Sequence, residues 1–313
     1  PEMQGISQPI VIAAAGQAQI DALTGIAVTR VESIPTQVEQ LTARVARWAR
    51  LQRMRNADKH VAIVYYNHPP GRHNIGADNL DVPASVLEIL KALRADGYDT
   101  GPLPQTPAEL LAKLQQDGVN LPEQGDVLRA MAKRVANVTA EQYATWFATL
   151  PEPLRKEMTG GPLALLQANV KHAQEARLPQ EARGQVTRTL GEIEHLIEGA
   201  QHPARNRALD LVKQLGAAYE VQLSRGDNEA SIDSLTRAIA ATGVEGLRGW
   251  GEAPGNVMVS EGKLVLPGVR FGNVFVGPQP PRGWELNEEL LHANTSIPPT
   301  HQYLAFYFWL RHQ

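Results

Sequence analysis

Apolar residues recur along this chain with two spacings, one typical of strands and one typical of helices. A short apolar run, Val61 to Tyr66, predicts a buried strand. Before it, Thr36 and Glu39 form a capping box that predicts a helix start. The apolar face of that helix is then carried at steps of three and four by Val38, Leu41, Val45, Trp48 and Leu51.

The first 150 residues alternate strand and helix patterns. Runs at 9–14 and 26–31 predict strands on either side of a short helix. After the strand at 61–66, a helix is expected from Asp81 until Gly97, which suits a C-terminal cap. Further helices are expected within 102–122, 124–136 and 140–149.

The pattern changes to helices alone from Gly160 to about Gly246. Breaks at Leu178-Pro179, His202-Pro203 and Ser224-Arg225-Gly226 divide this stretch into four helical segments. Apolar steps of three and four indicate faces that pack on neighbouring helices, which predicts an antiparallel bundle. No segment recurs in sequence, so we interpret the bundle as an insertion and not as a repeat array.

Strand signals return after the helical stretch. Runs at 256–260 and 263–266 flank Glu261-Gly262, which predicts a two-residue hairpin turn. A strand is expected at 269–276, followed by a proline-rich loop at 277–283 and a helix from about Pro299. The predicted fold class is α/β and helix-rich, with a Rossmann-like strand-loop-helix core and a mostly helical insertion. The predicted domains are an α/β part at 1–155, the insertion at 156–248, and a strand-loop-helix segment at 249–313 that returns to the α/β part.

Composition narrows the function classes. The 313 residues exceed the usual size of one domain, which agrees with two units or a large insertion. A formal charge of -3 gives no basic footprint for nucleic acid, and the absence of cysteine excludes disulfides and thiolate chemistry. No apolar run approaches the roughly 20 residues of a membrane span. We expect a cytoplasmic protein without nucleic-acid partners, and its two ends suggest an internal piece of a longer chain.

The loop at 67–76 follows the strand at 61–66 and leads into a helix. In open α/β sheets the ligand crevice lies beyond the carboxyl ends of the strands, so this position alone makes the loop a candidate site. Pro69-Pro70-Gly71 restricts the backbone between its polar groups. It matches neither common phosphate-binding motif, so nucleotide binding has little support, and a purely structural turn is equally compatible with these residues. The candidate ligand-binding residues are Asn67, His68, Arg72, His73, Asn74 and Gly76.

The loop at 277–283 is chemically similar to the first. It places an amide and a guanidinium, Gln279 and Arg282, beside Pro280-Pro281, with Asn273 shortly before. Arg282 could bind a carboxylate through two hydrogen bonds. His301 lies in the first turn of an apolar helix, where a buried imidazole needs either a partner in the core or a ligand.

Taken together, the blocks 59–76, 80–85, 250–251, 266–283 and 297–307 resemble the large-subunit family of cobaltochelatase and magnesium chelatase. Their signatures are Tyr65-Tyr-Asn-His-Pro-Pro-Gly71, Phe271-Gly-Asn-Val-Phe-Val-Gly-Pro-Gln-Pro-Pro-Arg-Gly283 and Tyr303-Leu-Ala-Phe-Tyr307. The resemblance covers about 1–155 and 247–313. It implies that the full subunit binds a tetrapyrrole and inserts a divalent metal, Co²⁺ or Mg²⁺, as substrate, while separate AAA+ subunits hydrolyse ATP.

The resemblance gives the candidate residues roles. Metal insertion needs a flat cleft, donors for the substituents of the macrocycle and bases for two pyrrole N–H protons. We expect His73 and His301 as bases, no resident metal ligands, and Asn67, Asn74, Asn273, Gln279 and Arg282 as substrate contacts. The family carries further His and Glu motifs after the position of the last helix, so we expect the isolated chain to be inactive. Because Arg72-His73 precede Asn-Ile-Gly here, the loop favours the cobalt type or an uncharacterised branch of the family over the magnesium type.

Three alternatives remain at this point. The protein could insert magnesium into protoporphyrin, or it could be a non-catalytic tetrapyrrole carrier or sensor. It could also be an unrelated α/β enzyme that binds a small substrate with the 67–76 loop. The segment 160–246 matches no known family motif, and docking of a partner is one role that it could serve.

Overall fold

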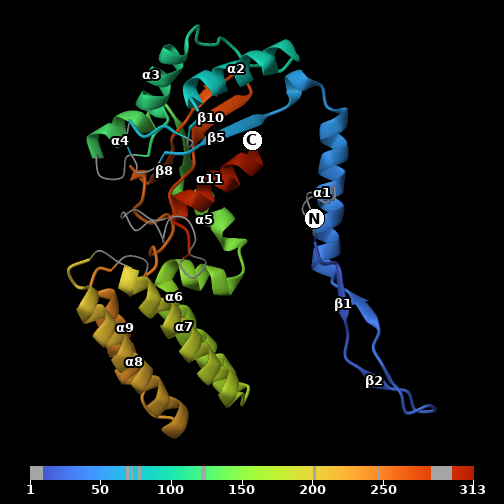
Figure 1. The fold of residues 1–313 in the computed structure, drawn as a ribbon, viewed down its shortest axis with the longest axis vertical. Coiled ribbons are helices and arrows are strands. Elements are labelled where there is room, and N and C mark those ends of the chain that lie inside the picture. The colour runs from blue at the N-terminus through green and yellow to red at the C-terminus, as the bar shows by residue number, and fades with distance from the viewer. Residues whose placement is uncertain are drawn as a thin grey trace. The chain divides into compact units, whose positions relative to one another are not determined.

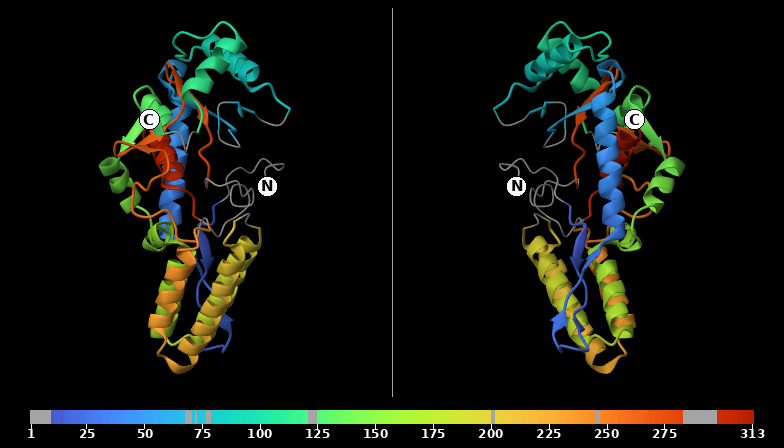
Figure 2. Two further views of the ribbon diagram at one scale, coloured as in Figure 1. Left: turned by 90° about the vertical axis from the view of Figure 1, so that its left-hand side faces the viewer. Right: turned by 90° about the vertical axis from the view of Figure 1, so that its right-hand side faces the viewer.

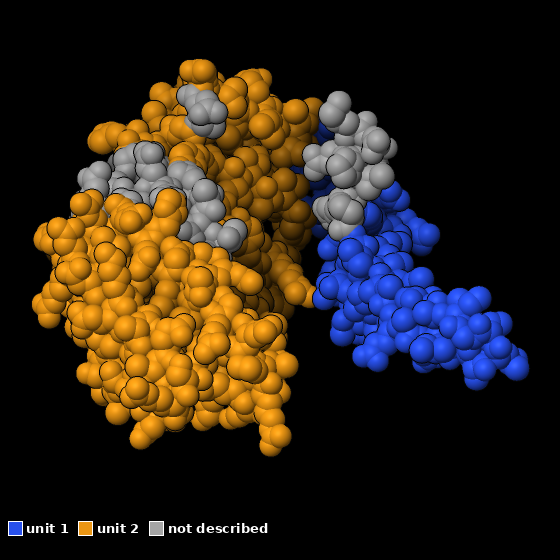
Figure 3. Space-filling model, turned by 60° about the horizontal axis from the view of Figure 1, so that its bottom comes forward, with its two compact units in different colours: residues 1–59, 96–99 blue, residues 60–95, 100–313 orange. Residues whose placement is uncertain are grey.

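The structure is a computed structural model that describes residues 10–67, 71, 73–76, 79–120, 125–199, 202–244, 247–282 and 298–313. The chain divides into two compact units (Figure 3). Unit 1 contains residues 1–59 and 96–99, and unit 2 contains residues 60–95 and 100–313. None of the helices in these described ranges is long and apolar enough to cross a membrane.

Unit 1 contains a narrow β arm. Strand β1 (Ala13–Ala15) pairs antiparallel with β4 (Val31–Ser33), and β2 (Gln19–Ile20) pairs with β3 (Ala27–Val28) (Figure 1). The prediction of a short helix between two strands is wrong. The Asp21 carboxylate instead accepts hydrogen bonds from the backbone N–H groups of Leu23 and Thr24, at 3.1 and 2.8 Å, and this holds a turn.

The arm is followed by helix α1 (Pro35–Arg53) and a 3-10 turn, η2 (Asn56–Asp58). The helix was predicted, but its capping box was not correct. Pro35 already occupies the first helical position and Ile34 is the N-cap residue, so Thr36 lies inside the helix. None of the 19 residues of α1 is buried, and its apolar face is exposed.

The α/β core of unit 2 is built on two parallel strands, β5 (Val61–Tyr65) and β10 (Val274–Pro278). Strand β9 (Val269–Phe271) pairs antiparallel with β10, so the strand predicted at 269–276 is in fact a hairpin. Gly272 makes the turn possible, because its φ of 54° favours glycine. Helices α2 (Val82–Ala95) and α3 (Pro107–Asp117) pack on this sheet through Leu87, Leu90, Leu110 and Leu114.

A second small sheet has the order β6-β8-β7. Its strands are β6 (Ala136–Thr139), β8 (Lys263–Leu266) and β7 (Val259–Ser260). The predicted hairpin turn is confirmed, because Glu261 and Gly262 both have positive φ values, 49° and 72°. Strand β6 was not predicted: helix α4 (Gly125–Ala132) ends before the expected residue 136 and the chain continues as a strand. Helices α5 (Ala140–Ala148) and α11 (His301–His312) share a core with this sheet.

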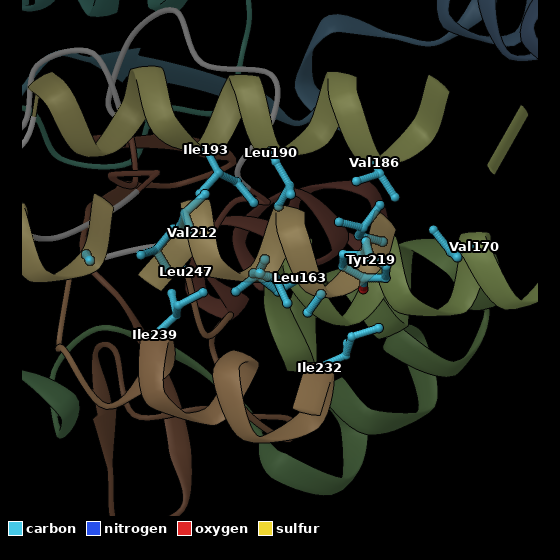
Figure 4. Close-up of a cluster of buried hydrophobic side chains, with 14 of the residues drawn as sticks. Leu163, Val170, Val186, Leu190, Ile193, Val212, Tyr219, Ile232, Ile239 and Leu247 are labelled. Carbon is cyan, nitrogen blue, oxygen red and sulfur yellow. The ribbon is translucent and has the colours of Figure 1, made fainter. Parts of the chain in front are cut away.

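The helical stretch forms four helices, as predicted. They are α6 (Glu152–Glu175), α7 (Pro179–Gly199), α8 (Arg205–Arg225) and α9 (Glu229–Ala240), and they pack side by side (Figure 2). Their inward faces make one hydrophobic cluster (Figure 4). The cluster includes residues from every helix, among them Leu163, Ile193, Val212 and Ile239. The bundle therefore has its own core.

The bundle begins and ends at one crossing of the backbone. The N–H groups of Trp250 and Gly251 donate to the carbonyls of Met158 and Thr159, at 2.7 and 3.2 Å. Gly161 interrupts α6 here with a φ of 80° and a ψ of -178°. A Cβ atom at Gly161 would lie 2.5 Å from the Leu247 carbonyl oxygen, so only glycine fits. The fold is helix-rich α/β as predicted, whereas the domain boundaries at 155 and 248 stay a prediction.

Candidate functional site at the carboxyl ends of two parallel strands

The two candidate loops begin side by side. Tyr65 pairs with Pro278 at the carboxyl end of the parallel pair, and the Gln279 N–H donates to the Tyr65 carbonyl at 2.7 Å. The loop after β5 and the loop after β10 therefore leave the same edge of the sheet. This edge is where ligands bind in open α/β sheets.

Asn67 fixes the loop after β5 from within. Its Nδ2 donates to the carbonyls of Gly71 and Asn74, at 2.8 and 3.0 Å. Its Oδ1 accepts from the backbone N–H of Asn120 at 2.8 Å. The Asn67 side chain is buried, and these three bonds use both of its polar atoms. Asn67 thus shapes the loop, and the described contacts give it no free donor for a ligand.

Asn120 is a member of this site that the sequence analysis missed. It lies in the segment after α3, is fully buried, and donates from Nδ2 to the Gln279 carbonyl at 3.1 Å. Its Oδ1 accepts from Nε2 of Gln302 at 3.3 Å. Gln302 Oε1 is buried and has no hydrogen-bond partner among the described residues. No local motif marks Asn120, because its partners are distant in sequence.

Two tyrosines fix further parts of the same edge. The hydroxyl of the buried Tyr65 donates to the Gly118 carbonyl, and burial raises the Tyr65 pKa far above its ordinary value. The Tyr307 hydroxyl donates to Gln279 Oε1 at 2.8 Å, so helix α11 orients the Gln279 side chain. Burial is also the main cause that raises the pKa of Tyr307. Both hydroxyls are therefore neutral donors at physiological pH.

The remaining loop candidates are more accessible. His73 and Asn74 are exposed, and Gly76 and Arg282 are half-buried. The Gly76 N–H donates to the Tyr66 carbonyl at 3.2 Å, which closes the loop after β5. His68 and Arg72 lie outside the described residues. His73 is therefore an accessible imidazole between Gly71 and Asn74, whose carbonyls Asn67 holds.

Asn273 lies at the other end of the strands. It belongs to the turn between β9 and β10, and its carbonyl accepts from the Val61 N–H at 3.0 Å, where β5 begins. There it lines a cavity of about 90 Å³ with Arg270 and Trp309. The structure therefore separates Asn273 from Asn67, Gln279 and the other loop candidates. The cause is the hairpin that replaces the single strand expected at 269–276.

His301 is held inside the core. Its Nε2 faces the Gly251 carbonyl and its Nδ1 faces the Tyr143 hydroxyl, both at 2.9 Å. A carbonyl can only accept, so Nε2 carries the proton and Nδ1 accepts from Tyr143. Burial lowers the pKa of His301, and interactions with Gly251 and Glu252 oppose that shift. To act as a base, His301 would have to release the Tyr143 hydroxyl.

No group of three or more His, Asp or Glu side chains within the described ranges is arranged to hold a metal ion. The described donors at this edge are amides, hydroxyls and backbone groups, together with the His73 imidazole and the Arg282 guanidinium. Such a set suits a polar or anionic organic ligand.

The family model described as CobN/Magnesium Chelatase matches residues 1–187 and 192–313, so the chain belongs to this family. The resemblance inferred from the sequence motifs is thereby confirmed. It also extends into the helical segment 160–246, so the expectation that this segment lies outside the family is wrong.

Individual relatives come from both branches of the family. The aerobic cobaltochelatase subunit CobN of Pseudomonas aeruginosa is 29% identical over 85% of this chain and 14% of its own length. The chloroplastic magnesium-chelatase subunit ChlH of Oryza sativa is 24% identical over 98% of this chain and 14% of its own length. The uncharacterized protein MJ0908 of Methanocaldococcus jannaschii is 24% identical over 93% of this chain and 16% of its own length.

A solved structure has a similar fold. The catalytic subunit of cobaltochelatase from Mycobacterium tuberculosis matches with a TM-score of 0.50 and 22% identity, over 96% of this chain and 17% of that one. The chain thus spans less than a fifth of the length of these relatives.

Proposed function

We propose that this chain is part of the tetrapyrrole-binding large subunit of an ATP-dependent metal chelatase, and that the subunit inserts cobalt into a corrin precursor for cobalamin biosynthesis. The observation that carries the proposal is the shared origin of two proline-rich loops at the carboxyl ends of β5 and β10. Membership of the family gives the class of substrate, and the loops give this chain a part in binding it.

The loops supply what a flat macrocycle requires. Asn67 holds the first loop from inside, and Tyr307 orients the side chain of Gln279 in the second. Asn74, Gly76, Gln279 and the Arg282 guanidinium then provide donors and a close backbone approach for the substituents of the macrocycle. His68 and Arg72 complete the proposed set of contacts.

Metal insertion releases two pyrrole protons, so a base must lie near the centre of the macrocycle. His73 has this role in the proposal because its side chain is exposed on the first loop. His301 assists by fixing α11, since both of its nitrogens are already hydrogen-bonded. The metal is a substrate here, and no resident metal is required.

Cobalt is the proposed metal because of the first loop. The order Arg72-His73-Asn74 in that loop favours the cobalt type, whereas relatives from both branches match this chain. ATP would be hydrolysed by separate AAA+ partner subunits and not bound by this chain. A cytoplasmic location belongs to the proposal, although the rice relative is named as chloroplastic.

The test is a titration of the full-length protein with hydrogenobyrinic acid diamide and with protoporphyrin. Binding is monitored by the quenching of protein fluorescence. We expect tighter binding of the corrin precursor, and weaker binding after His73→Ala or Asn67→Ala. His172→Ala changes an exposed histidine on α6 and is the control for His73. Asn137→Ala changes a half-buried amide on β6 and is the control for Asn67.

Each alternative gives a different result. Preference for protoporphyrin, with magnesium insertion, would identify the magnesium branch. Tight binding without insertion in the presence of the ATPase subunits would identify a carrier or sensor. No affinity for either macrocycle would refute the proposal and favour an unrelated small-molecule enzyme. If deletion of 160–246 abolishes complex formation but leaves macrocycle affinity intact, the bundle serves partner docking.

A further inference from the structure

Three segments that are distant in sequence meet at one buried residue, Asn120. They are the loop after β5, the loop after β10 and the first turn of α11. The backbone N–H of Asn120 donates to Asn67 in the loop after β5. Its Nδ2 donates to the Gln279 carbonyl in the loop after β10, and its Oδ1 accepts from Gln302 in α11. The residue itself is completely buried, so its contacts are with the protein.

The orientation of each amide in this cluster is set by backbone groups of fixed polarity. The carbonyls of Gly71, Asn74 and Gln279 can only accept, and the Asn120 N–H can only donate. If the Asn120 amide were flipped, its oxygen would face the Gln279 carbonyl oxygen and its NH₂ group would face the NH₂ group of Gln302. The observed orientation is therefore the one in which every contact joins a donor to an acceptor.

The bonds connect the two loops in series. Asn67 links the first loop to the backbone of Asn120, and the Asn120 side chain links that segment to the second loop. Because the cluster is buried, loss of one donor leaves the opposite acceptor without a partner. The starts of the two loops are also joined directly, by the Gln279 N–H and the Tyr65 carbonyl, and the two links through Asn120 add a second connection between the loops.

We propose that Asn120 is a positioning residue that sets the separation of the two loops and so shapes the surface that binds the macrocycle. This inference rests on the proposed function for its ligand. Asn120 does not touch the ligand, and it acts through Asn67 and Gln279.

The first test measures macrocycle affinity in the full-length protein, with hydrogenobyrinic acid diamide as the probe. Asn120→Ala removes both side-chain bonds, and Asn120→Asp keeps an acceptor for Gln302 but sets a carboxylate oxygen against the Gln279 carbonyl. We expect either variant to raise Kd about tenfold at a temperature where circular dichroism shows it folded. Asn137→Ala, whose amide bonds only to nearby carbonyls of its own segment, is expected to leave Kd unchanged.

A double-mutant cycle distinguishes positioning from general destabilisation. The two hydrogen-bonded links lie in series, so breaking either one removes the connection between the loops that runs through Asn120. The double variant Asn67→Ala with Asn120→Ala should therefore have a Kd no higher than that of the weaker-binding single variant. Effects on Kd that multiply would overturn the inference, and so would an unchanged Kd in Asn120→Ala.

Hydrogen exchange without any macrocycle keeps the inference testable if the proposed function fails. The backbone N–H groups of Gly76 and Gln279 are bonded to the carbonyls of Tyr66 and Tyr65, at 3.2 and 2.7 Å. In Asn120→Ala we expect both to exchange at least tenfold faster than in Asn137→Ala. Equal exchange in the two variants would overturn the positioning role, whereas absence of tetrapyrrole binding by the unaltered protein would refute only the proposed function.

Discussion

The hydrogen bond between Tyr143 and His301 can be used to test how the core between α5 and α11 is stabilised. Tyr143→Phe removes one hydroxyl and keeps the ring, which packs against His301 with centroids 5.5 Å apart and against Phe147 at 5.8 Å. Tyr143 is fully buried, so water cannot replace the lost donor without rearrangement. His301 Nδ1 is then left as a buried acceptor without a partner. This costs about 1–3 kcal/mol of unfolding free energy.

The loss should depend on pH. Burial lowers the pKa of folded His301 below its unfolded value of 6.5. The folded state therefore favours the neutral imidazole, and its contribution to stability is complete above pH 6.5 and decreases as the pH falls toward the folded pKa. Tyr143→Phe removes a bond that only the neutral ring accepts, so the folded pKa of His301 moves back toward 6.5. The stability difference between the two proteins should therefore be constant above pH 6.5. It should shrink once the pH falls below the folded pKa of His301 in the Tyr143→Phe protein.

The assay is thermal unfolding followed by circular dichroism between pH 5 and pH 8. The matched control is Tyr219→Phe in the helical bundle, because the Tyr219 hydroxyl is buried and has no hydrogen-bond partner among the described residues. That change should be neutral or slightly stabilising at every pH. Equal effects of the two substitutions at pH 8, or a Tyr143→Phe effect that grows as the pH falls, would refute the reasoning.

Three further predictions concern local structure, each measured by chemical or thermal unfolding. Gly161→Ala should destabilise the protein by about 3 kcal/mol or more, because the backbone conformation and the close approach of Leu247 leave no room for a Cβ atom. Gly184→Ala, in open space on α7, should stabilise the protein by about 0.5–1 kcal/mol. Equal effects of the two substitutions would show that the backbone segments do not approach closely at Gly161. Thr139→Ala should cost about 1 kcal/mol by removing the N-cap of α5 and Thr139→Ser should restore it; a loss with Ser as large as with Ala would exclude the cap. Arg134→Ala should cost less than about 1 kcal/mol, and a loss that persists in 1 M salt would argue against its exposed ion pair with Asp117 as the cause.

Local signals predicted the parts of the fold that local chemistry determines. The apolar run at 61–66, the Glu261-Gly262 turn and the helical spacing of 160–246 each specify one conformation through nearby residues, and the structure contains all three. The capping box failed because Pro35 begins the helix two residues earlier than a Thr36 cap would. Propensity gives no clear preference between two such close starts.

The errors share a different cause. Strand β6 forms because Ala136–Thr139 pairs with Lys263–Leu266, more than 100 residues later, and nothing near residue 136 specifies that partner. The run at 269–276 has strand-forming Val and Phe residues on both sides of Gly272-Asn273. That pair is a two-residue turn signal, and it was read as part of one strand, so the hairpin that places Asn273 at the other end of the sheet was missed. Asn120 escaped notice for the same reason, since its three partners come from three distant segments.

The backbone crossing at Gly161 has a consequence for protein engineering. The chain leaves the α/β frame at residues 158–161 and returns at 247–251, and hydrogen bonds join the two segments. A module whose ends meet at a comparable distance should therefore be able to replace the bundle without moving a strand. The crossing is a natural splice point for chimaeras in which another module replaces the bundle and the paired loops keep their register.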